Sequence, residues 1–417
     1  MLIQTLLNQC QKFKSFVYDK AQWEKVGGVQ ALVVRIIPRR NSRGQCGKCG
    51  EKAGTYDHQE ERRFRFVPLW GIPVYFRYQM RRVNCSRHGV RVESVPWAQG
   101  KSQRTQALEL FLARWARRLS WKEVGLCFEV SWESVYRSVK AVVDYGLKMR
   151  QLRGIEAIGV DEMQYAKGSK YMTLVYQIDE GFKRLLSVTE GRRVRSLLEF
   201  FRALGREQTQ KLKYICSDMW KPYLKVIAKK APQALHVLDR FHIVVNLNKA
   251  LDQIRASEAR RMTREGYEEV LKHTKYCFLK RRENLKPDQK TKLKEVLSYD
   301  LKTVRAYLLK ESFQLLWTYS SPHWARWYLT KWCGRANRSR LVPIKRFVRS
   351  MRKHQEKIFN WFKAKKQISA GSVEGMNRKI NLTTRKAYGF RSFEVLKIAL
   401  FHTMGQLPEP ESTHRFC

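Results

Sequence analysis

The feature that most constrains the fold of this chain is an alternation of strand-like and helix-like segments between residues 155 and 238. Short apolar runs predict strands at 155–160, 171–178, 184–188, 211–217 and 234–238. Apolar residues that recur every three or four positions predict helices at 194–205 and 219–230. Three strands followed by alternating helices and strands are typical of a mixed sheet covered by helices, so we expect an α/β core.

Acidic residues follow two of these predicted strands. Asp161 comes directly after the first strand and Asp218 directly after the fourth. A third acid, Glu374, lies in a later helical pattern that places Asn377 on the same face. Three carboxylates that converge from distant positions supply the hard oxygen ligands that two Mg²⁺ or Mn²⁺ ions prefer.

Each acid taken alone has an ordinary structural explanation. A single aspartate at a strand end more often forms a turn or caps a helix. A glutamate on an amphipathic helix more often lies on a solvated face. Glu162 and Asp179 are competing acids near the same predicted sheet.

The charge of the chain points to a polyanionic partner. Lys and Arg number 83 against 37 Asp and Glu, a formal net charge of +46. Solvated protein surfaces normally mix both signs, so this excess favours nucleic acid. A membrane surface attracts the same charge, but no apolar run approaches the roughly 18–20 residues that span a bilayer. The N-terminus also lacks the pattern of a signal peptide, so we expect a cytoplasmic, nucleoid-associated protein.

Three of the nine cysteines are spaced as metal ligands. Cys46 and Cys49 form one pair, and Cys85 with His88 forms a second pair with the same two-residue spacing. Alternating segments between the pairs predict a small antiparallel β-ribbon. Four such ligands suit Zn²⁺, so we predict a structural zinc site. His58 is an alternative fourth ligand, and the ordinary explanation is two turns with free thiols.

A helical region follows the predicted ribbon. Ser120 and Glu123 form the pattern of a capping box, and Ser131 can cap the next helix. Two short helices with a tight junction, the second carrying Arg137 and Lys140, predict a helix-turn-helix that contacts DNA. The pattern alone fits an ordinary αα-hairpin nearly as well, and the net charge favours the DNA-binding interpretation.

The remaining sequence completes a five-part organisation. Helical, highly charged sequence between the last predicted strand and Glu374 predicts an all-α insertion in the α/β core. The expected parts are a zinc-binding domain at 1–100, a helix-turn-helix domain at 101–152, a catalytic domain at 153–245 and 367–405, an insertion at 246–366 and a tail at 406–417.

Four motifs in this order resemble one known family. They are Gly159-Val160-Asp161-Glu162, Asp218-Met219-Trp220-Lys221-Pro222-Tyr223, Asp239-Arg240-Phe241-His242, and Val373-Glu374-Gly375-Met376-Asn377 with Tyr388-Gly389-Phe390-Arg391. The family is the ISL-three group of insertion-sequence transposases, and the resemblance covers nearly the whole chain. It implies an RNase H-like catalytic core with an all-α insertion, preceded by a zinc-binding β-ribbon and a helix-turn-helix.

The resemblance also assigns roles to individual residues. The family's catalytic triad, which binds two Mg²⁺ or Mn²⁺ ions, corresponds to Asp161, Asp218 and Glu374. Asp239 and His242 match an acid-x-x-His signature that supports the site or the DNA, and Asn377 is expected to support the triad. The basic residues beside Glu374 that we expect to contact DNA phosphates are Arg378, Lys379, Arg385 and Lys386.

We therefore predict a DDE transposase that binds the terminal inverted repeats of its insertion sequence. It is expected to cleave DNA and transfer the strand to target DNA with Mg²⁺, as a homodimer or larger assembly on DNA. Two alternatives remain open. A non-catalytic zinc-finger and helix-turn-helix regulator explains the charge but not the three acids. An RNase H-like nuclease or resolvase without joining activity shares the same site.

Overall fold

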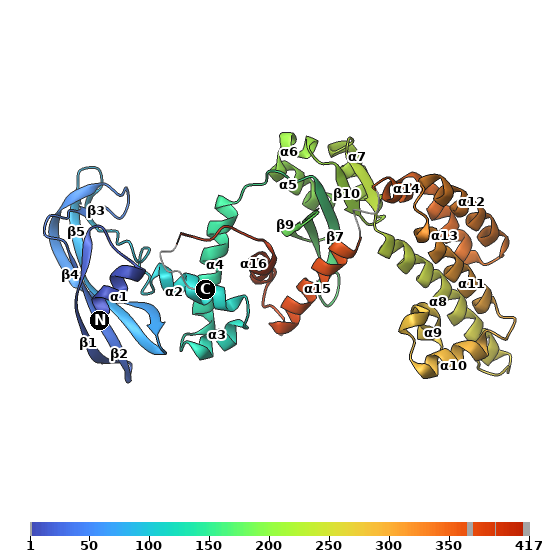
Figure 1. Ribbon diagram of the computed structural model, residues 1–417, viewed down its shortest axis with the longest axis horizontal. Helices are drawn as coiled ribbons and strands as arrows, with labels where there is room; N and C mark the ends of the chain where they lie inside the picture. Colours follow the sequence, from blue (N-terminus) through green and yellow to red (C-terminus); the bar gives the residue numbers. More distant parts are fainter. Residues whose placement is uncertain (1, 365–369, 388, 412–417) are drawn as a thin grey trace. The chain divides into compact units, whose positions relative to one another are not determined.

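The computed structural model describes residues 2–364, 370–387 and 389–411. Contacts divide the chain into two compact units, Met1–Gln151 with Asn381–Cys417 and Leu152–Ile380. Each unit has its own sheet and its own helices (Figure 1). Among the described helices, none combines the length and the apolar character that crossing a membrane requires.

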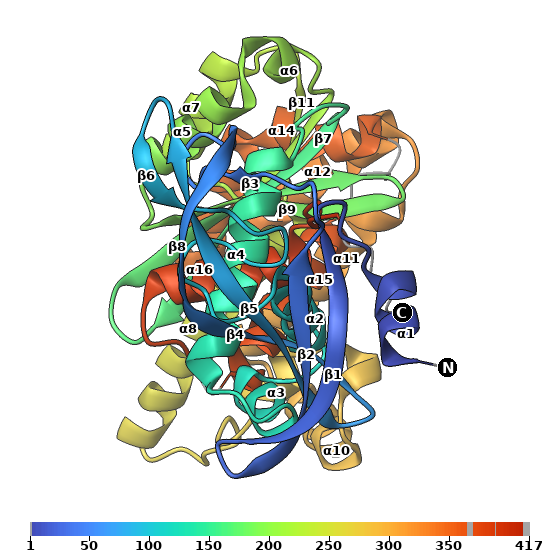
Figure 2. The same ribbon diagram turned by 90° about the vertical axis from the view of Figure 1, so that its left-hand side faces the viewer.

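The first unit begins with a six-stranded sheet in the order β1-β2-β5-β4-β3, with β6 paired to β5 (Figure 2). Its elements are α1 (Ile3–Cys10), β1 (Phe16–Val26), β2 (Val29–Pro38), β3 (Gly44–Gln45), β4 (Lys52–Leu69), β5 (Ile72–Cys85) and β6 (Gly89–Val92). Side chains along β5 alternate between buried and less buried positions, as a half-buried strand requires. The fully buried Trp97 packs against Phe16, Phe64 and Tyr78 and forms the centre of this core.

Three helices follow this sheet, α2 (Gln106–Ala116), α3 (Trp121–Cys127) and α4 (Trp132–Met149). The predicted capping box between Ser120 and Glu123 is confirmed, and Ser131 caps α4 as predicted. Helix α3 and the start of α4 approach closely at Gly125, where a Cβ atom would lie 2.7 Å from the carbonyl oxygen of Val130. A larger residue at this position would therefore force the junction open.

Helix α16 (Phe393–Met404) packs on α4, although it comes from the far end of the chain. The guanidinium of Arg150 lies 5.5 Å from the ring centroid of Phe401. The segment after α16 also contacts α4. A Cβ atom on Gly146 of α4 would lie only 2.6 Å from the Cβ atom of Leu407. These contacts place 381–411 in the first unit, whereas the sequence-based division assigned residues up to 405 to the catalytic domain.

The second unit contains the mixed α/β sheet that the sequence predicts, in the order β11-β10-β7-β8-β9. Its strands are β7 (Ala157–Ala166), β8 (Lys170–Asp179), β9 (Phe182–Glu190), β10 (Tyr214–Ser217) and β11 (Leu235–Leu238). Strands β7, β8 and β9 are antiparallel, while β10 and β11 run parallel to β7. Helices α5 (Val194–Leu204), α6 (Arg206–Gln210) and α7 (Lys221–Lys230) accompany the sheet, and the apolar faces of α5 and α7 share one core with it.

Strand β7 is longer than the sequence predicts. The prediction ends it at Val160, but β7 continues through Asp161 to Ala166 because β8 pairs with it over that whole length. Asp161 lies opposite Leu174 in this antiparallel pair. The polar residues after Asp161 give no apolar pattern that would indicate a strand. They form a strand because they pair with the neighbouring strand.

The insertion consists of helices in the described residues, as predicted. Its elements are α8 (Arg240–Arg264), α9 (Lys275–Leu279), η1 (Arg282–Asn284), α10 (Pro287–Val296), α11 (Lys302–Gln314), η2 (Leu315–Thr318), α12 (Pro322–Arg338), α13 (Val342–Lys353) and α14 (Gln355–Lys363). Helix α8 begins beside the sheet, directly after β11, and continues into the insertion (Figure 1). Helix α14 packs on β11, where the Asn360 amide donates a hydrogen bond to the carbonyl oxygen of His236 at 2.8 Å. Helix α15 (Ala370–Lys386) then carries Glu374.

Candidate active site and metal centre

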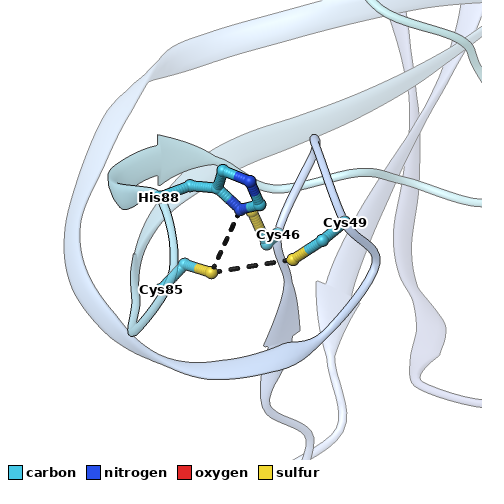
Figure 3. A group of neighbouring side chains, drawn as sticks. All are labelled: Cys46, Cys49, Cys85 and His88. Atoms are coloured by element: carbon cyan, nitrogen blue, oxygen red, sulfur yellow. Dashed lines mark hydrogen bonds between the residues drawn. The ribbon is translucent and has the colours of Figure 1, made fainter.

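Three cysteines and one histidine converge in the first unit (Figure 3). The ligand atoms of Cys46, Cys49, Cys85 and His88 all lie within 4.8 Å of one another. The Cys85 sulfur lies 3.6 Å from the Cys49 sulfur and 3.7 Å from Nδ1 of His88. His58 lies on β4 and is not part of this group, so the alternative fourth ligand is wrong.

Backbone hydrogen bonds around Cys46 favour the thiolate form of its side chain. Hydrogen bonds from the backbone N–H groups of Cys49 and Lys48 lower the pKa of Cys46 to about 7. The thiolate is the form that binds metals, so these donors favour ligation near neutral pH. The turn also requires Gly47, because a Cβ atom there would lie 2.6 Å from the carbonyl oxygen of Val92.

Two of the predicted acids meet at neighbouring strands of the second unit. Val160 of β7 is the register partner of Ser217, the last residue of β10. Asp161 and Asp218 therefore follow directly paired residues of two parallel strands. The backbone N–H of Trp220 donates to Oδ1 of Asp218 at 2.9 Å and holds this carboxylate beside the sheet.

Helix α15 is attached to the same place through Asn377. The Asn377 amide donates a hydrogen bond to Oδ2 of the buried Asp161, and its oxygen accepts one from the Tyr176 hydroxyl at 2.8 Å. On the other face of this helix, Val373, Met376 and Ile380 are buried. Helix α15 thus has an apolar face against the core, and Asn377 places the turn that carries Glu374 near Asp161.

Asp239 and His242 lie at the start of α8 and complete an acidic cluster. Asp239 caps the helix by accepting from the backbone N–H of Phe241 at 2.7 Å. Nε2 of His242 is 3.5 Å from Oδ1 of Asp161 and 3.8 Å from Oδ2 of Asp239. Burial opposes charge on His242, but the hydrogen bond to Asp161 and the surrounding carboxylates raise its pKa. A positively charged imidazole is therefore favoured among these acids.

Burial raises the pKa of Asp239, and the charges of Asp161 and Glu374 raise it further. Glu374 itself forms an ion pair with Arg378 at 2.7 Å. Among the described residues, the cysteine and histidine group is the only set of three or more such ligands close enough to hold one metal ion. Asp161, Asp218 and Glu374 do not form such a set.

Arg192, which follows β9, belongs to none of the motifs that the sequence shows. Its guanidinium lies 4.6 Å from the ring centroid of Trp220, forms an ion pair with Glu162 and comes within 3.7 Å of Asp218. Burial raises the pKa of Glu162 to about 7. One of its oxygens, Oε1, is buried without a hydrogen-bond partner among the described residues.

Asp179, the other competing acid, lies at the opposite end of the sheet. It accepts hydrogen bonds from the backbone N–H groups of Glu156 and Ala157, at 3.2 Å and 2.7 Å. Asp179 therefore fixes the start of β7 and is separate from the candidate site.

The residues predicted to contact DNA are on helix surfaces. Arg137 and Lys140 are exposed on α4, and Lys140 forms an ion pair with Asp144. The exposed basic residues of α15 are Arg378, Lys379, Arg385 and Lys386. The motif residue Tyr388 lies outside the described residues.

Two family models match the chain. One, described as a transposase of the ISL-three type, covers residues 158–400, and so spans both aspartates and α15. The chain belongs to this transposase family. The other, the zinc-finger of transposase IS204/IS1001/IS1096/IS1165, covers residues 42–88 and so spans the cysteine and histidine group. An ISL-three transposase with an N-terminal zinc ribbon is the family assignment that both matches support.

Curated relatives agree with this family over nearly the whole length. The transposase for insertion sequence element IS1557 of Mycobacterium tuberculosis is 28% identical over 428 residues, covering 96% of this chain and 95% of the relative. The transposase for insertion sequence element IS1001 of Bordetella parapertussis is 25% identical over 398 residues, covering 94% and 96%. Family membership therefore extends beyond the two matched segments.

Proposed function

We propose that this chain binds the terminal inverted repeats of its insertion sequence and catalyses Mg²⁺-dependent strand cleavage and strand transfer. The observation that carries the proposal is the placement of Asp161 and Asp218 after paired residues of β7 and β10, with α15 attached to Asp161 through Asn377. An RNase H-like core is part of the proposal. It is supported by three antiparallel strands extended on one side by two parallel ones.

The donor set fits divalent cations. Carboxylate oxygens are the hard ligands that Mg²⁺ prefers, and the unpartnered buried oxygen of Glu162 is an additional acceptor. Asp161, Asp218 and Glu374 would hold the two ions. Such ions, when bound, activate the attacking oxygen and stabilise the leaving one.

The remaining residues of the site position these ligands and balance their charge. Asn377 and Tyr176 hold one oxygen of Asp161 in place, and His242 offers a positive charge to the other. Arg192 neutralises Glu162 and Asp218, and Arg378 neutralises Glu374. Four or more carboxylates in a small volume repel one another, so these cations stabilise the site before a substrate arrives.

The first unit supplies DNA recognition in this proposal. A structural Zn²⁺ bound by Cys46, Cys49, Cys85 and His88 would hold the β3 turn against the end of β5. Helices α3 and α4 would act as a helix-turn-helix, with Arg137 and Lys140 facing the phosphates. Both ends of an element must be held together for transfer, so the active form is a homodimer or larger assembly on DNA.

The test uses Asp161→Asn with Asp300→Asn as a matched control. Asp300 is an exposed acid in the insertion, and the substitution is chemically the same. The substrate is a duplex that contains the DNA flanking the coding region, incubated with Mg²⁺. We expect Asp161→Asn to lose cleavage while it binds the duplex as the unchanged protein does, and Asp300→Asn to keep both activities.

Near-normal strand transfer by Asp161→Asn would refute the proposed site. Cleavage by the unchanged protein without any joined product would instead indicate a nuclease or resolvase. A protein that binds the ends but never cleaves them with Mg²⁺ would be a DNA-binding regulator.

A further inference from the structure

A basic cavity lies in the all-α insertion, apart from the residues discussed so far. It has a volume of about 640 Å³ and is formed by α8 and the beginnings of α11 and α13. Helix α8 packs against both α11 and α13, so the cavity is part of one packed region (Figure 1). The charged residues that line it are Glu258, Arg260, Arg261, Arg264, Lys302 and Arg340.

The single acid of the cavity is already engaged. Glu258 is buried and accepts hydrogen bonds from the backbone N–H groups of Lys302 and Thr303, at 2.9 Å and 2.7 Å. It also accepts from the Thr303 hydroxyl at 2.7 Å. Its negative charge therefore stabilises the first turn of α11, where the backbone N–H groups favour an anion.

The cations of the cavity outnumber their acidic partners. Arg261 and Arg264 share Glu265, with N–O distances of 3.8 Å and 3.6 Å. Arg260, Lys302 and Arg340 have no carboxylate partner among the residues that the structure describes. All three side chains are exposed. Three unneutralised cations from three segments of chain therefore face the same open cavity.

Arg340 occupies a backbone position that is unusual for arginine. It follows α12 and its C-cap Ser339 with a φ of 60°, in the left-handed region that favours glycine at helix ends. The adjacent N-terminus of α13 has no side-chain cap, so its first N–H groups add positive potential beside the guanidinium. The backbone conformation at this position favours glycine, so an arginine here is explained by its side chain and not by the backbone.

We propose that this cavity binds phosphates of the DNA backbone and is a second DNA contact, distinct from α4 and α15. The proposal rests on the proposed function because it takes DNA as the polyanion. Guanidinium groups bind phosphate with paired hydrogen bonds, and cations spread over three segments match phosphates repeated along a strand. Their exposure suits a large surface ligand better than an enclosed small one.

The test combines Lys302→Ala with Arg340→Gly in the full-length protein. Glycine removes the guanidinium and is the residue that the left-handed backbone favours, so the helix end is kept. The matched control is Lys290→Ala with Lys294→Ala, which removes two exposed cations of α10 that do not line the cavity. Affinity for a short DNA duplex is measured at several salt concentrations.

Loss of two phosphate contacts should make the slope of log affinity against log salt shallower by about 1.8. The control variant should keep the slope of the unchanged protein. Equal slopes for the cavity variant and the unchanged protein would overturn the inference while leaving the proposed function intact. An unchanged protein without salt-dependent affinity for DNA would instead overturn the proposed function itself.

A second measurement separates DNA from small polyphosphates. Thermal unfolding is recorded with and without inorganic tripolyphosphate, for the unchanged protein and the cavity variant. Stabilisation by tripolyphosphate that the variant loses, together with an unchanged DNA slope, would assign the cavity to a small polyphosphate and overturn its assignment to DNA.

Discussion

Asn377 joins helix and sheet at the candidate site through one amide group. Replacing it with alanine removes a hydrogen bond to Asp161 and leaves the Tyr176 hydroxyl without its acceptor. Residues that orient metal ligands typically contribute 10- to 100-fold to metal affinity or activity. We expect Asn377→Ala to lower Mn²⁺ affinity and strand cleavage by roughly this factor, measured by calorimetry and by cleavage of an end-containing duplex.

Tyr176→Phe is the graded control for this prediction. It removes only the hydroxyl that donates to Asn377 and leaves the amide bound to Asp161. Its effect should be smaller than that of Asn377→Ala. An Asn377→Ala variant with unchanged Mn²⁺ affinity would show that Asp161 needs no such positioning.

Single residues differ in how far the sequence reveals them. Asp161 and Asp218 follow apolar segments, and the family motifs mark them together with Glu374. Arg192 belongs to no pattern among 83 basic residues, and only the folded chain places it over Trp220. The two-residue spacing from Cys85 favours His88 over His58 as a ligand, and the turn between β5 and β6 brings His88 beside Cys85.

At the scale of elements, the contact between β7 and α15 leaves no spare room. A Cβ atom on Gly159 would lie 2.6 Å from Cγ2 of Val373. Gly159→Ala should push α15, with Glu374, away from the sheet. We expect it to lower stability by about 1–3 kcal/mol, the usual effect of overpacking, and to reduce cleavage.

A double variant tests whether this contact is the cause. Val373→Ala removes the clashing methyl groups, so Gly159→Ala with Val373→Ala should recover part of the lost stability and cleavage. Gly375→Ala is the matched control, because nothing lies within 4 Å of a Cβ atom there. Denaturant unfolding is measured for the unchanged protein, Gly159→Ala, the double variant and Gly375→Ala. A double variant that is no more stable than Gly159→Ala would contradict the explanation.

Helix α16 should make the first unit sensitive to acid. Burial lowers the pKa of His402 to about 3, and the charges of Arg117 and Lys386 act in the same direction. An unfolded histidine titrates near 6.5, so the unfolded chain takes up a proton that the folded one refuses. The stability that His402 contributes is therefore complete above about pH 6.5 and falls as the pH decreases towards 3.

The loss should be on the order of 2 kcal/mol at pH 5. His402→Leu should flatten the dependence of unfolding on pH over this range, as measured by denaturant titrations at several pH values. His58→Gln, at an exposed histidine of the same unit, should leave the dependence unchanged. Equal pH dependence in His402→Leu and the unchanged protein would exclude this histidine as the cause.

The sequence predicts the order of the helices and strands better than it predicts where each one ends or which other elements it packs against. Apolar periodicity located the strands of the second sheet, but not the extension of β7 through polar residues, which depends on pairing with β8. Nor does periodicity indicate that α16 packs on α4, because an apolar face does not specify which other face will cover it.

At the scale of the whole molecule, the two units separate two kinds of chemistry. The four zinc-type ligands lie in the first unit, and the acids with their balancing cations lie in the second. Local motifs predict both groups, and the structure brings the four zinc-type ligands together. Contacts between segments more than two hundred residues apart place 381–411 in the first unit, and no local pattern in the sequence indicates such contacts.

This separation predicts that zinc and the catalytic ions act independently on stability. Ligand thiols must be deprotonated and held together to bind zinc, so Cys49→Ser should weaken zinc binding and destabilise the first unit. Cys127→Ser is the matched control, an exposed cysteine of the same unit outside the ligand group. Calorimetric unfolding should show a lower transition temperature for the first unit in Cys49→Ser and after zinc chelation.

Mn²⁺ titrations should show unchanged affinity at the carboxylates of the second unit. Loss of Mn²⁺ affinity along with zinc would mean that the two units fold as one cooperative body.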